Sequence, residues 1–322
     1  MDFSLMTEPQ MGGTYDQLLV LARWAENRGL VSFARSDHYY SSADPSHDAT
    51  DAFATLAGLA RETDTIRLCV LVSPVTFRHP AVIVKNALTI DQMSGGRFDL
   101  GIGTGWMSEE HEAFGLDLWP MAERFGRFDD ALHYVKAAFG PQPARYDGTF
   151  YQLKADVKPG PIGPLPVIVG GTGKKRTPTL AGRYADEYNQ SPAPVAVLAE
   201  NIQTMRQAAE AAGRDPAEIV TSIMGSVLIG NDEGSFRDHL AAAALQRNTE
   251  PKDLQDRFEQ AGMPVGAADK ARDLLDRWEE AGVDRFYVRQ MEIDDLDLLD
   301  AVSYTHLTLP TIVRECRSRW SP

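Results

Sequence analysis

The residues best suited to chemistry follow apolar segments of strand length. Asp37 and His38 come directly after the segment 31–35. A histidine in such a place can hydrogen-bond a cofactor ring or transfer a proton near neutral pH. By position alone, an exposed loop histidine with Asp37 capping a turn explains the pair about equally well. Asp37 and His38 are therefore candidate catalytic residues.

Two glycine-rich segments are candidate binding sites. The segment 101–105 (Gly-Ile-Gly-Thr-Gly) follows a strand pattern and would let a ligand approach the backbone, but it lacks the G-x-G-x-x-G spacing of dinucleotide-binding turns. The segment 170–173 (Gly-Gly-Thr-Gly) precedes three basic residues, 174–176, and a helical pattern over 177–184. Free N–H groups and the helix dipole could bind a phosphate there. A solvated basic helix start is the alternative.

Leu71, Val72 and Ser73 end another apolar stretch, and composition alone favours buried core at these positions. Arg78 follows, and it would either pair with a carboxylate or face an anionic group. The acidic run 109–112 could supply paired acids or metal ligands, although such a run is more often the solvated face of a helix. Because no metal-binding spacing occurs, we predict no metal site, and the lack of a Gly-x-Ser-x-Gly elbow argues against a serine hydrolase.

The elements that must position these residues alternate regularly between strand and helix. About eight apolar strand patterns alternate with helical ones, which indicates an α/β protein with a (β/α)8 barrel. The carboxyl ends of barrel strands gather at one face, where active sites form. A Pro- and Gly-rich stretch, 141–164, contains a hairpin pattern over 145–151. We expect it to be an insertion after the fourth or fifth strand.

Composition excludes several classes of partner. The net charge of −14 argues against nucleic acid and against an anionic membrane surface. The sequence shows no secretion signal and no bilayer-length apolar stretch, and its two cysteines suggest no disulfide framework. We expect a cytoplasmic protein that acts on a small molecule, with a homodimer possible.

The C-terminal residues do not fit the barrel pattern. Reverse translation of residues 302–311 gives a string that resembles a transposase sequencing adapter. We therefore expect a single barrel domain over 1–301 and a non-native tail over 302–322.

Several motifs together resemble the bacterial luciferase-like superfamily, in its coenzyme F420-dependent oxidoreductase branch. The resemblance runs from about residue 1 to residue 301 and implies a (β/α)8 barrel with an insertion. The motifs are Ser36-Asp37-His38-Tyr39, Phe77-Arg78-His79-Pro80-Ala81, Ser94-Gly95-Gly96-Arg97 and Gly101-Ile102-Gly103-Thr104-Gly105-Trp106.

The resemblance also implies roles for individual residues. His38 would lie beside the deazaflavin ring and the substrate, and the Leu71–Val72 peptide bond would be cis, behind the ring. The cofactor-binding residues would be Leu71, Val72, Ser73, Gly103, Thr104, Trp106, Gly170, Gly171 and Thr172, with Arg176 as a further phosphate contact.

These observations predict an enzyme that transfers a hydride between coenzyme F420 and an organic substrate. An FMN-dependent monooxygenase on the same fold is the main alternative. A hydrolase that uses His38 with Glu109 or Glu110, and a cofactor-free binding protein, are further alternatives.

Overall fold

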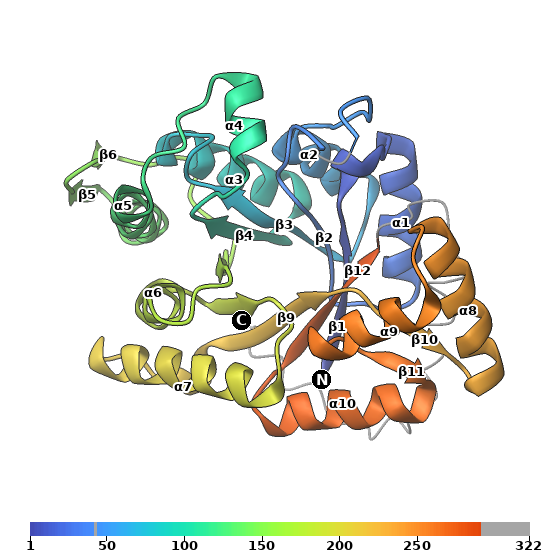
Figure 1. Cartoon of the computed structure of the whole chain (residues 1–322). Coiled ribbons are helices and arrows are strands. Elements are labelled where there is room, and N and C mark those ends of the chain that lie inside the picture. Colours follow the sequence, from blue (N-terminus) through green and yellow to red (C-terminus); the bar gives the residue numbers. More distant parts are fainter. Residues whose placement is uncertain (42–43, 291–322) are drawn as a thin grey trace.

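The computed structural model describes residues 1–41 and 44–290. Within these residues, eight parallel strands close into a barrel, and the last strand is hydrogen-bonded to the first (Figure 1). The predicted (β/α)8 barrel is therefore confirmed. In order around the barrel, the strands are β1 (Asp2–Thr7), β12 (Arg285–Gln290), β9 (Val220–Gly225), β8 (Glu187–Gln190), β7 (Val167–Gly170), β4 (Phe98–Gly103), β3 (Arg67–Pro74) and β2 (Ser32–Arg35).

Helices surround the barrel, and local sequence signals fix several of their ends. Thr14 and Gln17 form a reciprocal capping box at the start of α1. Pro80 opens α3, and Gly95 ends it with a φ of 71°. The helices of this layer are α1 (Tyr15–Asn27), α2 (Ala52–Glu62), α3 (Pro80–Ser94), α5 (Met121–Phe139), α6 (Arg176–Tyr184), α7 (Val195–Ala211) and α10 (Ala268–Glu280), with short helices α4 (Ser108–Phe114), η1 (Pro9–Met11) and η2 (Pro216–Glu218) in connections.

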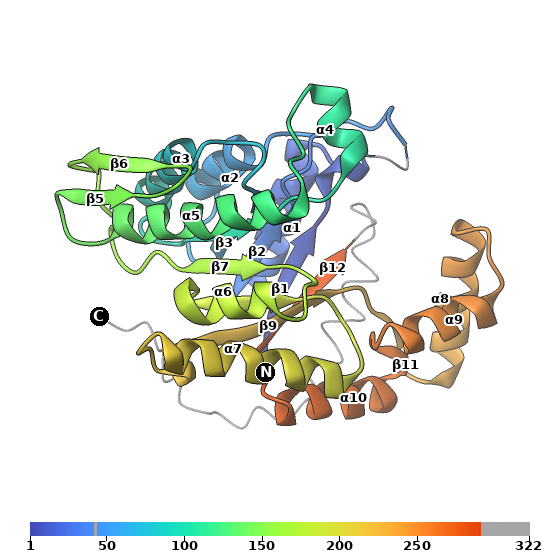
Figure 2. The same ribbon diagram turned by 60° about the vertical axis from the view of Figure 1, so that its left-hand side comes forward.

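Two segments leave the barrel. The first is the hairpin of β5 (Ala144–Asp147) and β6 (Gln152–Ala155), which confirms the predicted hairpin after the fourth barrel strand. Figure 2 shows this hairpin beyond the C-terminal end of α5, at the end of the barrel opposite α4. The second contains β10 (Leu228–Gly230), α8 (Glu233–Gln246), α9 (Pro251–Gln260) and β11 (Val265–Ala267), and it has its own apolar core.

One predicted strand is wrong. The apolar pattern over 220–229 indicated a single strand, but the chain leaves β9 at Gly225 and begins β10 at Leu228. β10 pairs with β11 and not with the barrel. An apolar run cannot show which sheet its second half will join, because both halves are buried.

Packed side chains fill the barrel from its amino end upward. Arg285 and Glu187, each the first residue of its strand, form an ion pair of 2.6 Å, and Arg67 pairs with Asp99. Paired charges are the form in which buried ions are tolerated. The next cluster consists of Met6, Ala34, Cys69, Leu71, Ile168 and Tyr287. The amino end of the barrel interior is therefore filled, and the carboxyl end is the face at which active sites form in barrels of this kind.

The predicted boundary at residue 301 and the predicted tail, 302–322, lie outside the described residues. Among the helices that are described, none combines the length and apolarity needed to cross a bilayer.

Candidate functional site

The carboxyl ends of β2, β3, β4 and β7 bring the predicted residues to one end of the barrel. These strands are adjacent and parallel, and the register pairs Pro74 with Gly103. Thr104 follows β4, His38 follows β2 and Gly171 follows β7. Since parallel strands end on the same side, residues distant in the chain share this face.

Val72 is enclosed by glycines from two neighbouring strands. The Leu71–Val72 peptide bond is cis, as the resemblance implies, and the β3–β4 register shifts between Val70 and Ser73. A Cβ placed on Gly103 or on Gly170 would lie only 2.7 Å from a methyl group of Val72. Glycine at 103 and 170 therefore leaves the space that the Val72 side chain occupies. The Val72 side chain itself is partly exposed.

His38 is held from the β4 side by Glu110. Its Nδ1 lies 2.9 Å from Oε2 of Glu110, whose side chain is fully buried, while the His38 side chain is 19% exposed. The other carboxylate oxygen accepts the backbone N–H of Tyr39. The Trp106 and His38 rings meet in a T-shaped contact with centroids 5.9 Å apart, and Trp106 is 67% exposed. Nε2 is the ring nitrogen left for a ligand.

Asp37 faces a guanidinium group. Both of its carboxylate oxygens accept hydrogen bonds from Arg78, which also pairs with Asp51 and lies 3.4 Å from the Ser73 hydroxyl. Burial alone would lower the pKa of Arg78, but the negative charge of Asp37 raises it above its usual value. The pair joins the loop after β2 to the loop after β3.

The loop after β4 is fixed from two sides. Arg124 donates a hydrogen bond of 2.6 Å to the carbonyl of Gly105. The buried His111 ring contacts the Met107 carbonyl at 2.6 Å and the Thr76 hydroxyl at 2.8 Å. The backbone beside Trp106 is therefore anchored to both α5 and the β3 loop.

The turn after β7 presents backbone N–H groups at the start of a helix. Gly171 has a φ of 154°, and Thr172 and the basic residues that follow are exposed. Lys175, which precedes α6, makes no capping hydrogen bond with its side chain. The first N–H groups of a helix have no partner within it, so an anion can accept them. Arg176 lies over the ring of Phe125, at 5.2 Å from its centroid.

Comparison with known proteins places this barrel in a family. A family model described as luciferase-like monooxygenase matches residues 1–285. The chain belongs to the luciferase-like monooxygenase family.

Two curated proteins are similar to this luciferase-like chain over about half of its length. Pyrimidine monooxygenase RutA of Escherichia coli (strain K12) is 32% identical over 178 residues, which cover 53% of this chain and 46% of RutA. The F420-dependent glucose-6-phosphate dehydrogenase of Microbacterium testaceum is 34% identical over 176 residues, 54% of this chain and 52% of that enzyme. The chain spans about half the length of the curated relatives it matches.

A solved structure shares the fold over most of the chain. Monooxygenase RslO1 from Streptomyces bottropensis superposes with a TM-score of 0.78 at 20% sequence identity, over 95% of this chain and 99% of that one. The likeness shows that the luciferase-like barrel extends beyond the segments in which sequence identity is high.

Glu110 does not follow the solvated helix face that the acidic run favoured, and the sequence had named it beside His38 only as one of two carboxylates in an alternative. The acidic run suggested a solvated helix face, and Glu109 and Glu112 are exposed as that pattern predicts. Glu110 instead turns inward from α4 to His38. The only signal in the sequence was that a histidine and a carboxylate both follow barrel strands, which does not select one carboxylate among three.

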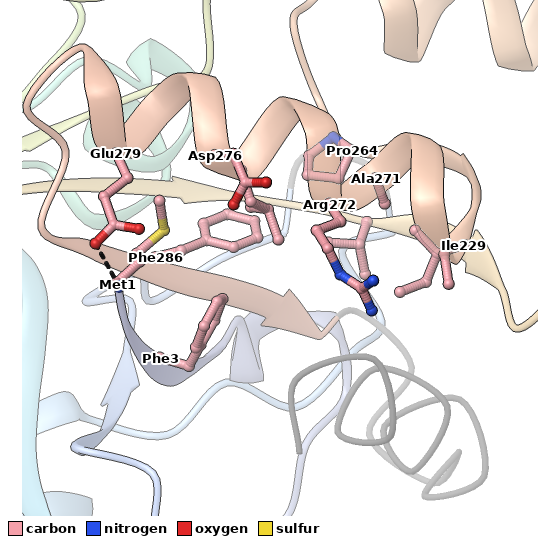
Figure 3. A pocket seen from close by; sticks show the side chains of 12 residues that line it. Met1, Phe3, Ile229, Pro264, Ala271, Arg272, Asp276, Glu279 and Phe286 are labelled. Carbon is pink, nitrogen blue, oxygen red and sulfur yellow. Dashed lines mark hydrogen bonds and ion pairs between the residues drawn. The ribbon is translucent and has the colours of Figure 1, made fainter. Parts of the chain in front are cut away.

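A pocket on the outer surface is separate from this site (Figure 3). It lies between α10, β1 and β12, is lined by Phe3 and Phe286 among others, and encloses about 60 Å³. Figure 3 also shows the ion pair between the Met1 amino group and Glu279. Ligand sites typically span several hundred Å³. The pocket is too small for a tricyclic cofactor, and the predicted site residues do not line it.

Proposed function

We propose that this luciferase-like protein binds coenzyme F420 and transfers a hydride between it and a small organic substrate. The observation that carries the proposal is the shared location of His38, Val72 and the turn at Gly171. A histidine, a partly exposed apolar side chain and a glycine-rich turn thus lie at one end of the barrel, each at the end of one of four adjacent strands, and we take them as the proton-transfer group, the ring support and the phosphate-binding turn.

The residues present fit a flat ring with a phosphate-bearing tail. Val72 is partly exposed, and the glycines at 101, 103 and 170 leave the room it occupies. The turn 170–173 leads to the start of α6, whose first N–H groups have no partner within the helix, and Lys174, Lys175 and Arg176 are exposed there. When bound, F420 would supply a two-electron hydride donor or acceptor.

The chain's own residues would position reactants and move a proton. Val72 and the backbone from Leu71 to Ser73 would support one face of the ring. His38 would exchange a proton with the substrate at Nε2, because Nδ1 is engaged by Glu110. Trp106 would contribute apolar surface that displaces water from the reacting groups.

Similarity to the pyrimidine monooxygenase RutA favours a monooxygenase as the competing function, and FMN is the cofactor that we weigh for it. Spectroscopic titration of the purified protein with F420 and with FMN separates the two. We expect saturable binding of F420 and none of FMN at the same concentrations. Tight FMN binding with oxygen consumption would overturn the proposal, and so would binding of neither cofactor.

A charge substitution tests whether the turn after β7 binds the phosphate. Thr172→Glu adds a negative charge at an exposed position and should weaken F420 binding by about tenfold or more, since like charges repel across a short distance. Gln207→Glu makes the same charge change on an exposed position of α7 and serves as the control. Equal affinities for the two variants would place the phosphate elsewhere.

A further inference from the structure

His38 and Glu110 form a pair whose geometry bears on which ring nitrogen carries a proton. Nδ1 and Oε2 are 2.9 Å apart, a hydrogen-bond distance, and the contact joins the loop after β2 to α4. One of the two atoms must donate. Either Nδ1 carries a hydrogen and Glu110 is ionised, or Glu110 is protonated and Nδ1 accepts.

The second partner of Glu110 favours the first arrangement. Its Oε1 accepts the backbone N–H of Tyr39, and a backbone N–H can only donate. Both oxygens of the fully buried carboxylate therefore meet donors if Nδ1 carries hydrogen. Hydrogen bonds to the charged form favour ionisation.

Among residues 1–41 and 44–290, the charged groups near Glu110 do not offer it a competing cation. Arg78 lies over the Tyr39 ring at 5.3 Å, but Asp37 and Asp51 already pair with it. His111, the next residue on α4, is bound to a carbonyl and to a hydroxyl. His38 is therefore the side chain that can donate a hydrogen bond to Glu110.

We propose that Glu110 is a positioning residue that holds His38 in the Nδ1–H tautomer and leaves Nε2 as a proton acceptor. The inference rests on the proposed function for its catalytic meaning, although the tautomer itself does not depend on a cofactor. Neutral His38 then has a lone pair at Nε2, and the ionised Glu110 stabilises the imidazolium that forms when Nε2 takes a proton.

The proton and electron balance of the step is simple. For an alcohol substrate, the carbon would give up a hydride, one hydrogen with two electrons, to bound F420. The proton of its O–H would go to Nε2 of His38, and a carbonyl would remain. In the reverse direction His38 returns the proton to the oxygen. Glu110 gains and loses no proton in either direction.

Nitrogen-15 NMR of protein labelled at histidine tests the tautomer without cofactor, because the two ring nitrogens of neutral histidine have distinct shifts. His38→Gln identifies the His38 signals among those of seven histidines. We expect Nδ1–H in the parent protein. In Glu110→Gln, the amide oxygen can accept the Tyr39 N–H while the amide NH₂ donates to Nδ1, so His38 should change to the Nε2–H tautomer. Finding Nε2–H in the parent protein would overturn the proposal.

Kinetics provide the second readout. Glu110→Gln should leave the Kd for F420 within about twofold and lower kcat by about 100-fold, the range that general acid–base catalysis contributes. Glu109→Gln, the exposed neighbour, should change neither the tautomer nor kcat. A changed Kd with unchanged kcat would show a merely structural role. If the NMR result holds but F420 does not bind, the proposed function fails while the tautomer assignment stands.

Discussion

Replacing Gly170 by alanine should destabilise the barrel through a single side chain, that of Val72. All three atoms nearest to a Cβ at Gly170 belong to Val72, the closest at 2.7 Å. That distance is about 1 Å shorter than an ordinary carbon–carbon contact. Val72 is β-branched and also meets Gly103, so it cannot rotate away freely. We expect Gly170→Ala to cost about 2 kcal/mol, as for other overpacked sites.

A second substitution shows whether Val72 is the cause. Val72→Ala removes both methyl groups and should cost about 1 kcal/mol alone, because the side chain is only partly buried. In that background Gly170→Ala should cost almost nothing. The double-mutant cycle should therefore give an interaction energy of about 2 kcal/mol.

Equilibrium urea unfolding of the four proteins measures this cycle. Gly163→Ala is the matched control, since a Cβ at Gly163 meets nothing within 4 Å, and its effect should stay within about 0.5 kcal/mol. An equal cost for Gly170→Ala with and without Val72 would refute the argument, because the strain would then arise elsewhere.

Two further outcomes follow from buried or hydrogen-bonded charges. Arg78→Leu leaves the buried Asp37 without its guanidinium partner and should cost about 3 kcal/mol in urea unfolding, with a smaller loss if Asp37→Asn is added. The second outcome concerns Glu26. Burial alone would raise the pKa of Glu26, but hydrogen bonds from the N–H groups of residues 64–66 hold it below its ordinary value of 4.5. This stabilisation exists above that value and disappears as the pH falls through the lowered pKa. The difference in unfolding free energy between the parent and Glu26→Gln should therefore shrink from about pH 6 to pH 3; a constant difference would contradict it.

The barrel could be predicted because its signals are local. Apolar strands, amphipathic helices and caps such as the one at Thr14 are set by residues a few positions apart. Strand order in a (β/α)8 barrel then follows from the sequence of elements. The end of β9 at Gly225 was not predicted. Whether residues 228–230 pair with the barrel or with β11 depends on long-range contacts, which the apolar pattern of these residues does not reveal.

The sequence indicated the end of the barrel at which the site residues lie, but it did not indicate which of their side chains contact one another. Every parallel strand end in a barrel lies on the same face, so His38, Gly103 and Gly170 could be expected there. The contact between His38 and Glu110 spans 72 positions and depends on how α4 rotates after β4. The strand glycines suggested close approach of a ligand to the backbone, whereas the structure shows that they first make room for Val72.

The anchoring of the loops explains why this site can hold its geometry before a ligand binds. Arg78 fixes the β2 loop to the β3 loop, His111 fixes the β3 loop to the β4 loop, and Glu110 fixes the β4 segment back to the β2 loop. Val72 and Gly170 extend the chain of contacts to β7. Each of these loops is thus held by a side chain from another loop. Such contacts reduce the rearrangement that the site would otherwise undergo during the reaction. Removing one of these contacts should therefore lower kcat more than it weakens cofactor binding. The Glu110→Gln experiment compares these two quantities, kcat and Kd.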